Sequence, residues 1–377
     1  MKCNGRRLVT VKTIHGQFQF AQQRFYTPGE GELSYLEYTG QLSGMSERLQ
    51  EWVCYLANRM SYHEVIKELQ RVTGVALLSA PGLQQLVLAK AQTVSQRQAQ
   101  QVQAVLAYNP ALPKLSQSVN VYDPDSEEVL LLGDGVCVKR QKKQRPRSVP
   151  AQTRRPDEAK WVNTDVMMLQ QPGGDFSYLM TGLTEQTEPP VSLPDLVKVG
   201  LITAYGQAQE PLKLVAITDG ARHMRLLLEQ VLGQSLTLIL DWYHLRKKCT
   251  ELMSMIARTK TEKVTHLPTL LAYLWRGQTD QALTYLKTEV VARHSGKLSE
   301  LITYLDKHAS EIIDYQRRQQ VGKPIGSGRM EKGIDLTVAQ RQKRKGMSWS
   351  DLGSHALALL KTVELNGQWH TLWASCP

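Results

Sequence analysis

The sequence has no apolar run long enough to cross a membrane. Its longest runs, such as Leu236–Leu240, are far shorter than the roughly 20 residues that a membrane-spanning helix needs. The chain also opens without the charged-then-apolar leader of a secretory signal. These absences predict a protein that stays in the cytoplasm.

Cysteine is scarce and scattered. The five cysteines form no Cys-x-x-Cys pair, and they lie at Cys3, Cys54, Cys137, Cys249 and Cys376. An odd, dispersed set argues against a disulfide framework and against a zinc knuckle. A reduced compartment fits this pattern best.

Acidic residues are outnumbered, with 35 Asp and Glu against 46 Lys and Arg, for a net charge of +11. Such an excess favours a polyanionic partner, because each neutralised phosphate releases counterions. Charge alone leaves DNA, RNA and an anionic membrane surface open. The 377 residues are enough for two or three domains, each with its own core.

Three of the few acids stand in local settings that would aim them at one point. Asp134 interrupts an apolar strand pattern in Val129-Leu-Leu-Leu-Gly-Asp-Gly-Val-Cys-Val138, and Asp219 ends a second one, Leu214-Val-Ala-Ile-Thr-Asp-Gly220. Glu331 follows the glycine-rich turn Ile325-Gly-Ser-Gly-Arg-Met330, which indicates the start of a helix.

Two acids on buried strands and a third on a helix are what a two-metal phosphoryl-transfer site requires. Two Mg²⁺ (or Mn²⁺) ions need carboxylate oxygens on rigid supports, roughly 4 Å apart across one phosphate. Asp134, Asp219 and Glu331 are therefore candidate metal ligands and catalytic residues of an enzyme that cuts nucleic-acid strands. For each acid alone, a turn or helix-cap role stays open.

The sequence of the N-terminal part predicts two regions. Residues 1–44 resemble a β-hairpin region around His15-Gly16. Residues 45–117 read as short helices, the second opened by a Ser61/Glu64 capping box, in the manner of a helix-turn-helix DNA-binding region. Gln84 and Gln85 on the third helix are the candidate base contacts. A plain helical bundle or a dimerisation element is the alternative.

The pattern of residues 118–377 predicts a mixed α/β domain. Strands are expected at 128–138, 161–169, 176–183, 213–218 and 236–241, with helices at 192–206 and 221–232. Three strands, then alternating helix and strand, is the order of a ribonuclease H-like core. Leucines at helical spacing over about 245–320 predict an all-α insertion. Because this domain carries its own apolar faces, we expect it to fold without residues 1–115.

Two basic stretches are candidate DNA contacts. The first follows the first core strand and contains Lys139, Arg140, Lys142, Lys143 and Arg145. The second follows Glu331 and contains Arg341, Lys343, Arg344 and Lys345. Such cations would hold phosphates rather than read sequence. For the first stretch, a solvated loop is the alternative.

These motifs together resemble the bacterial DDE-type insertion-sequence transposases, near the ISKra and ISLre groups and more distantly the Mutator-like elements. Asp134-Gly135, Asp219-Gly-Ala221 and Glu331 look like the three family acids. Asp241-Trp-Tyr-His244 resembles the family's D-x-x-H motif, and Gly346-Met-Ser-Trp-Ser350 a segment that follows its glutamate. The likeness covers roughly residues 120–365.

The resemblance implies a transposase that cuts double-stranded DNA at transposon ends and joins the freed 3′-hydroxyl to target DNA. It implies a homodimer or larger assembly, since the ends come in pairs, and a nucleoid-associated protein. Asp241 and His244 would position a phosphate or a water, unless they only cap and pack. Relatives often carry a cysteine pair where this chain has Arg24-Phe-Tyr-Thr-Pro28, so no zinc site is expected.

Two other functions remain open. A ribonuclease H-fold nuclease or resolvase would use the same metals without strand transfer. A domesticated DNA-binding regulator would use only the helix-turn-helix-like region, although the presence of all three acids argues against it.

Overall fold

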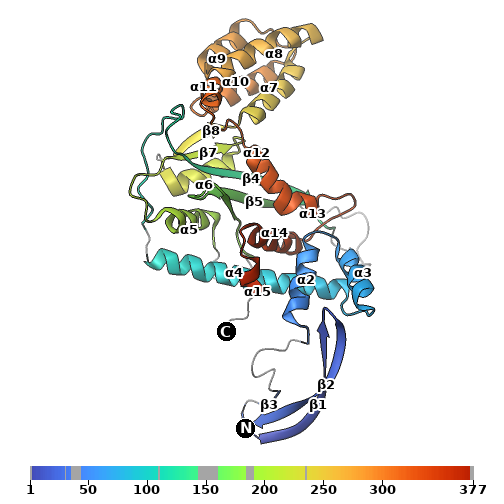
Figure 1. Ribbon diagram of the computed structural model, residues 1–377. Coiled ribbons are helices and arrows are strands. Elements are labelled where there is room, and N and C mark those ends of the chain that lie inside the picture. The colour runs from blue at the N-terminus through green and yellow to red at the C-terminus, as the bar shows by residue number, and fades with distance from the viewer. Residues whose placement is uncertain are drawn as a thin grey trace.

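The computed structural model describes residues 2–29, 31–34, 44–108, 111–142, 160–183, 191–233 and 236–373. Figure 1 shows a central sheet with helices on both sides, a helical lobe at one end and a β-ribbon at the other. The class is mixed α/β, as the sequence predicts.

The N-terminal ribbon is a three-stranded antiparallel sheet. Its strands are β1 (Lys2–Thr13), β2 (Gly16–Thr27) and β3 (Gly31–Ser34). Gly16 turns the chain with φ +121°, a conformation that favours glycine. The predicted hairpin is therefore confirmed, although its strands are longer than the apolar pattern indicates. The ribbon projects away from the body and joins it where Lys12 pairs with Met45 (Figure 1).

Three helices follow, namely α2 (Glu47–Ala57), α3 (Tyr62–Thr73) and α4 (Ala80–Tyr108). Ser46 caps α2, and the Ser61/Glu64 capping box opens α3 as predicted. Gly74 ends α3 in the left-handed conformation. α4 is one continuous helix of 29 residues that runs along the body (Figure 1).

The central sheet has the strand order β6-β5-β4-β7-β8. The bounds are β4 (Val129–Lys139), β5 (Trp161–Gln170), β6 (Phe176–Leu179), β7 (Leu214–Thr218) and β8 (Leu236–Leu240). β4, β5 and β6 pair antiparallel, whereas β7 pairs parallel with both β4 and β8. The strands match their predicted positions, except that β6 is shorter than expected.

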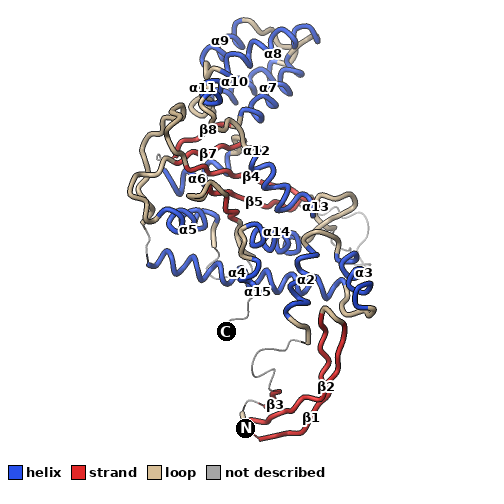
Figure 2. The backbone as a smooth tube through the Cα atoms, in the orientation of Figure 1, coloured by secondary structure: helices blue, strands red, loops and turns tan. Residues whose placement is uncertain are grey.

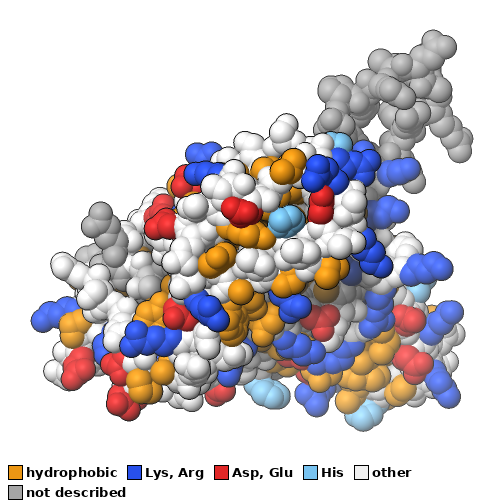
Figure 3. Space-filling view, turned by 90° about the horizontal axis from the view of Figure 1, so that it is seen from above, with side chains coloured by type: hydrophobic (Ala, Val, Ile, Leu, Met, Phe, Trp, Pro, Cys, Tyr) orange, Lys and Arg blue, Asp and Glu red, His pale blue; other side chains and the backbone are white. Residues whose placement is uncertain are grey.

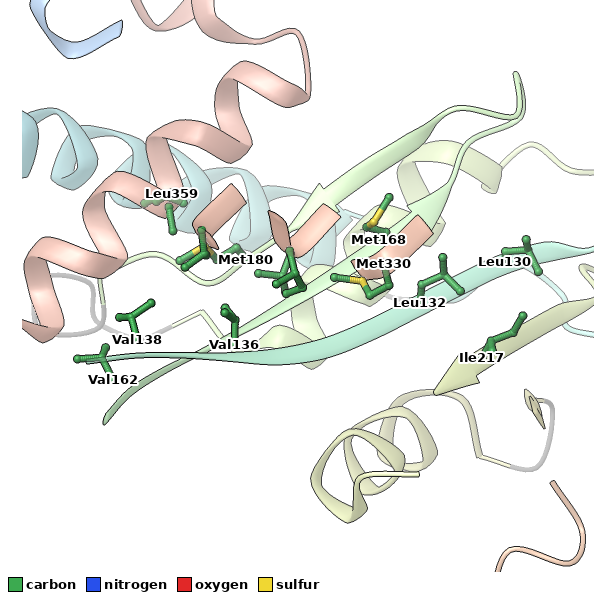
Figure 4. Close-up of a cluster of buried hydrophobic side chains, with 14 of the residues drawn as sticks. Leu130, Leu132, Val136, Val138, Val162, Met168, Met180, Ile217, Met330 and Leu359 are labelled. Atoms are coloured by element: carbon green, nitrogen blue, oxygen red, sulfur yellow. The ribbon is translucent and has the colours of Figure 1, made fainter. Parts of the chain in front are cut away.

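Helices cover both faces of this sheet. Alternate residues of β4 and β7, among them Leu131 and Ala216, pack against α5 (Leu193–Tyr205) and α6 (Arg222–Leu232). The intervening residues face α12 (Gly328–Ile334), the π-helical η3 (Asp335–Ala339), α13 (Gln340–Gln342) and α14 (Asp351–Leu365). Figure 4 shows this second cluster, in which Met330 of α12 lies among Leu132 and Met168 of the sheet.

A helical lobe follows β8. It consists of α7 (Trp242–Ile256), α8 (Lys260–Trp275), α9 (Thr279–Thr288), α10 (Ser295–Lys307) and α11 (Tyr315–Gln320). Figure 2 shows these helices joined by loops above β8. Trp242 packs against Trp275 and Tyr315 to close the base of the lobe. The helices predicted over about 245–320 are confirmed.

The N-terminal helices pack directly against the α/β part, so residues outside that part cover some of its apolar surface. α4 lies against α14, and its Ala91 and Val94 are buried in the cluster that α14 also joins. Ser95 Oγ accepts a hydrogen bond from the Leu183 amide at 2.8 Å. α2 packs on the C-terminal α15 (Trp369–Trp373). The apolar pattern of α4 does not predict this packing. Periodicity indicates that one face of a helix is buried, but it does not indicate which other element covers that face.

No helix within the described ranges is both long and apolar enough to cross a membrane.

Candidate active site

Asp134 and Asp219 emerge from neighbouring parallel strands. β4 and β7 pair from Val129 opposite Leu214 to Leu132 opposite Ile217. Continuing this register by two residues places Asp134 beside Asp219, just past the end of β7. Side chains alternate between sheet faces, so both acids point to the face that α12 covers. The sequence prediction that the two acids are neighbours therefore agrees with the strand pairing.

The local turns around these acids hold their backbones. Asp219 Oδ1 accepts a hydrogen bond from the Ala221 amide at 2.8 Å, and Asp134 Oδ1 accepts one from the Gly135 amide at 2.7 Å. Gly220 has φ +84°, and a Cβ there would lie 2.9 Å from Leu240. Asp219 therefore also stabilises the local turn, which is the role expected for an isolated Asp-Gly pair.

Glu331 lies in the first turn of α12, which contacts β4 and β5. Met330 beside it is fully buried in the sheet core. Gly333, two residues on, lies so close to the sheet that a Cβ would come within 2.5 Å of Met168 Sδ. This close approach brings the first turn of α12 down toward Asp134.

Asp241 connects the loop before α12 to the strand beside Asp219. Its Oδ1 accepts hydrogen bonds from the Tyr243 and His244 amides at 2.6 and 3.0 Å, which caps α7. Its Oδ2 accepts hydrogen bonds from the amide and the hydroxyl of Ser327. Burial alone would raise the pKa of Asp241, but the hydrogen bonds from His244 and Ser327 lower it to about 2.

His244 is a titratable basic side chain beside the acids. Its Nδ1 lies 3.5 Å from Asp241 Oδ2, and this interaction raises the pKa of the imidazole. Burial opposes the rise, whereas the charges of Asp219 and Asp134 add to it. A histidine biased toward its charged form beside the acids can attract a phosphate. Asp241, by contrast, is occupied as a cap and a loop anchor.

Burial raises the pKa of Asp134, and the nearby charges of Asp219 and Glu331 raise it further. The Gly135 amide and His244 lower it. The charges of Asp219 and Glu331 thus both act on the partly buried Asp134, which is an electrostatic condition that a bound cation would relieve. In the described part of the chain, no three His, Cys, Asp or Glu side chains converge as they stand on one metal-sized point. The donor set is suited to Mg²⁺ by its chemistry.

Sequence patterns missed a buried network under the Asp219 turn. His308 Nδ1 lies 2.8 Å from Glu311 Oε2, and Arg225 of α6 pairs with the other Glu311 oxygen. A Cβ on Gly220 would lie 3.1 Å from the His308 ring. Burial, with the charges of Lys307 and Arg225, lowers the pKa of His308 to about 4. His308 and Glu311 are only three residues apart, but no pattern in the sequence connects them to Arg225 or to Gly220, which the fold brings beside them.

The first basic stretch is partly described. Lys139 ends β4, and Lys142 is exposed. Arg140 pairs with Asp351 at 2.7 Å, which restrains it on the protein surface. Lys143 and Arg145 lie outside the described residues.

The second basic stretch is not a continuous surface strip. Arg341 is buried, where its Nε donates to the Ala57 carbonyl at 2.7 Å and its guanidinium lies over the Trp349 ring. The expectation that Arg341 contacts DNA is therefore wrong, because its charge is used to join α13 to α2. Lys343, Arg344 and Lys345 are exposed as expected.

On the helix-turn-helix-like region, Gln85 of α4 is exposed and Gln84 is half-buried. Their role in base contact stays a prediction.

Figure 3 views the molecule from above the helical lobe. Lys and Arg side chains are denser in the right half of this face, the side on which α12 and α13 lie in Figure 1. On this face, cations are therefore denser on the side where α12 and α13 lie.

No protein-family model matches the chain, and neither the curated proteins nor the solved structures contain a match.

Proposed function

We propose that the protein is a DDE-type DNA transposase, in which Asp134, Asp219 and Glu331 form the site of strand cleavage and strand transfer. The observation that supports this most is the placing of Asp134 and Asp219 on adjacent parallel strands, with both side chains toward the helix of Glu331. The mixed order β6-β5-β4-β7-β8 is compatible with the ribonuclease H-like core that such a function would use.

The three carboxylates would hold two Mg²⁺ or Mn²⁺ ions, which when bound would activate the attacking oxygen and stabilise the leaving one. The protein's own groups would position the DNA strand. His244, drawn toward its charged form, would attract the phosphate to Asp134 and Asp219. Asp241 would fix the loop of Ser327, and with it the start of α12. The exposed cations on this side of the molecule would hold the flanking DNA, and paired transposon ends would call for a dimer or larger assembly.

The test uses DNA that flanks the gene in its genome, searched first for inverted repeats bounded by short target duplications. Purified protein with Mg²⁺ should nick this DNA at the repeat ends and join the ends to a second duplex. We expect Asp134→Asn, Asp219→Asn and Glu331→Gln each to reduce cleavage by about 10²- to 10³-fold or more, with DNA affinity largely kept.

Asp165→Asn is the matched control. Asp165 lies on β5 opposite Gly135, but it points to the other sheet face, where His223 Nε2 lies 3.0 Å from its Oδ2. Cleavage by this variant should stay near that of the parent protein. Near-normal cleavage by any of the three site variants would remove that residue from the site, and cleavage without joining would favour the nuclease alternative.

A further inference from the structure

A second surface feature lies at the far end of β4 from the three acids. A hollow of about 550 Å³ opens between the end of β4, the start of β5 and the segment after α13. This volume is within the range of ordinary ligand pockets. We call it the Trp161 hollow, and the side chains used below are Cys137, Lys139, Trp161, Lys343 and Arg344.

Trp161 is far more exposed than the other tryptophans compared with it. Its surface is 55% exposed, whereas Trp242, Trp349 and Trp369 are at most 9% exposed. An indole usually buries most of its area, so an exposed one beside a hollow offers a stacking surface. Its cross-strand partner is Lys139, so a cation lies next to the ring.

The cations around the hollow are held on a fixed backbone. The Trp349 amide donates to the Lys139 carbonyl at 2.9 Å, and the Gln141 amide donates to the Trp349 carbonyl at 2.7 Å. Arg344 Nε donates to the Gln340 carbonyl at 2.9 Å. Arg140 nearby is paired with Asp351, but across the described ranges no acidic side chain pairs with Lys139, Lys343 or Lys345.

An exposed aromatic ring among cations that pair with no described acidic side chain is the combination that binds single-stranded nucleic acid. Bases stack on the ring whatever their identity, and the cations hold the backbone phosphates. An acidic peptide would use the cations but would leave the indole without a stacking partner. The chemistry therefore favours a nucleic-acid strand over an acidic protein segment.

The hollow also lies on the strand that carries Asp134, although Cys137, Lys139 and Trp161 point to the opposite sheet face, so a DNA strand would pass from the acids to the hollow around the edge of β4. Five residues separate Asp134 from Lys139 on β4, roughly 17 Å of extended chain. That distance corresponds to about five stacked nucleotides of one strand. Because β7 ends at Thr218, it pairs with β4 only before Asp134, so β7 does not cover the β4 edge between the acids and the hollow.

We propose that the Trp161 hollow binds an unpaired base of the DNA strand that occupies the candidate active site, with the base stacked on Trp161 and its phosphates on Lys139, Lys343 and Arg344. This inference rests on the proposed function, because it names the form of that substrate as locally single-stranded.

The first test measures binding without catalysis. Anisotropy of labelled 20-nucleotide oligothymidine, and of a duplex of equal length, is followed in EDTA at one fixed salt concentration. We expect Trp161→Ala to weaken oligothymidine binding by about 5- to 150-fold, and to change duplex binding by less than about threefold. Trp161→Phe should keep most of the affinity, because it keeps a stacking ring. Tyr108→Ala, at an aromatic residue that is 93% exposed, is the control and should change neither.

The second test leaves Trp161 in place and uses Cys137, which lines the hollow. Burial raises the thiol pKa of Cys54 and Cys249 to about 12, so these two should not react. In a Cys3→Ser, Cys376→Ser background, maleimide should label Cys137, and oligothymidine should slow the labelling. Poly-glutamate of similar charge should not slow it.

The outcomes separate the inference from the function on which it rests. Three results would each contradict binding at the Trp161 hollow without bearing on the three acids. Trp161→Ala could weaken oligothymidine and duplex binding equally, or it could leave oligothymidine binding unchanged. Poly-glutamate could also protect Cys137 from maleimide as well as oligothymidine does. Normal cleavage by the three acid variants would overturn the proposed function, whatever the binding assay gives.

Discussion

Asp241 accepts four hydrogen bonds with one carboxylate, and they join two parts of the candidate site. Two come from the first turn of α7, and two come from Ser327, before the helix of Glu331. The side chain is 1% exposed, so these donors replace the water that would otherwise solvate its charge. The residue that fixes the geometry is therefore distinct from the acids that would hold metal.

Asp241→Asn should show a pH-dependent loss of stability. The folded pKa of about 2 lies below the ordinary 3.8, so the ionised form contributes stability above pH 3.8 that is lost as the pH falls through about 2. The shift corresponds to roughly 2 kcal/mol. Urea unfolding at pH 7 should show the variant less stable by about this amount, and the gap should narrow between pH 4 and pH 2. As a control, Asp351→Asn alters an exposed ion pair and should have nearly the same free energy of unfolding as the parent at every pH. A stability difference for Asp241→Asn that does not change with pH would contradict a stabilising role for the ionised Asp241.

At the same scale, the sequence predicted some site residues and misjudged others for physical reasons. Asp134 and Asp219 could be found because apolar strands that end in Asp-Gly reveal both burial and a turn. The burial of Arg341 could not, since its acceptor is the carbonyl of Ala57 on a distant helix. His308 was missed for a similar reason, because Arg225 and Gly220, which lie beside the His308–Glu311 pair, come from other parts of the chain.

The helix α12 is positioned by glycines and by a buried ionic cluster. Gly326 lies against the Tyr243 ring, where a Cβ would come within 2.5 Å, and Gly333 lies against Met168. Just before this segment, Arg318 makes a two-pronged pair with Glu128, and Lys323 pairs with the same carboxylate at 2.7 Å. Arg318 is fully buried, so this cluster fixes the loop that leads to Glu331 against the start of β4. The glycine-rich turn was evident from sequence, but the packing that requires it was not.

Breaking that cluster from one side should be costly. Arg318→Met leaves Glu128 buried and short of a partner, and we expect a loss of about 3–5 kcal/mol in the free energy of unfolding, measured in urea. Adding Glu128→Gln should recover part of the loss, because it removes the uncompensated charge. Arg140→Met breaks an exposed pair and should cost less than about 1 kcal/mol. Similar costs for Arg318→Met and Arg140→Met would show that the cluster does not fix this loop.

Across the whole molecule, strand and helix positions were predicted more successfully than the division into domains. Local periodicity reports that a face is buried, but it does not report which distant element covers it. α4 illustrates the difference, since Gln98 Nε2 donates to the Met180 carbonyl at 2.9 Å and Val102 joins the core beneath α5. Arg59 of the N-terminal helices also pairs with Glu364 of α14. The three helices that were expected to form a separate DNA-binding region are thus part of the body that carries the site.

Two truncations should therefore behave differently. Removing residues 1–44 deletes the ribbon, which meets the body through the hydrogen bond from the Ser46 amide to the Lys12 carbonyl and through the packing of Ile14, and should shift Tm by less than about 4 °C. Removing residues 1–115 also deletes α2, α3 and α4, and exposes the apolar part of α14 that lies beside α4, which includes Leu359 and Val363. We expect that protein to lose its cooperative thermal transition and to aggregate. Calorimetry of the full chain and both truncations makes the comparison. A cooperative transition near the parental Tm in the shorter protein would show that the α/β body folds alone, which would restore the division into independent domains.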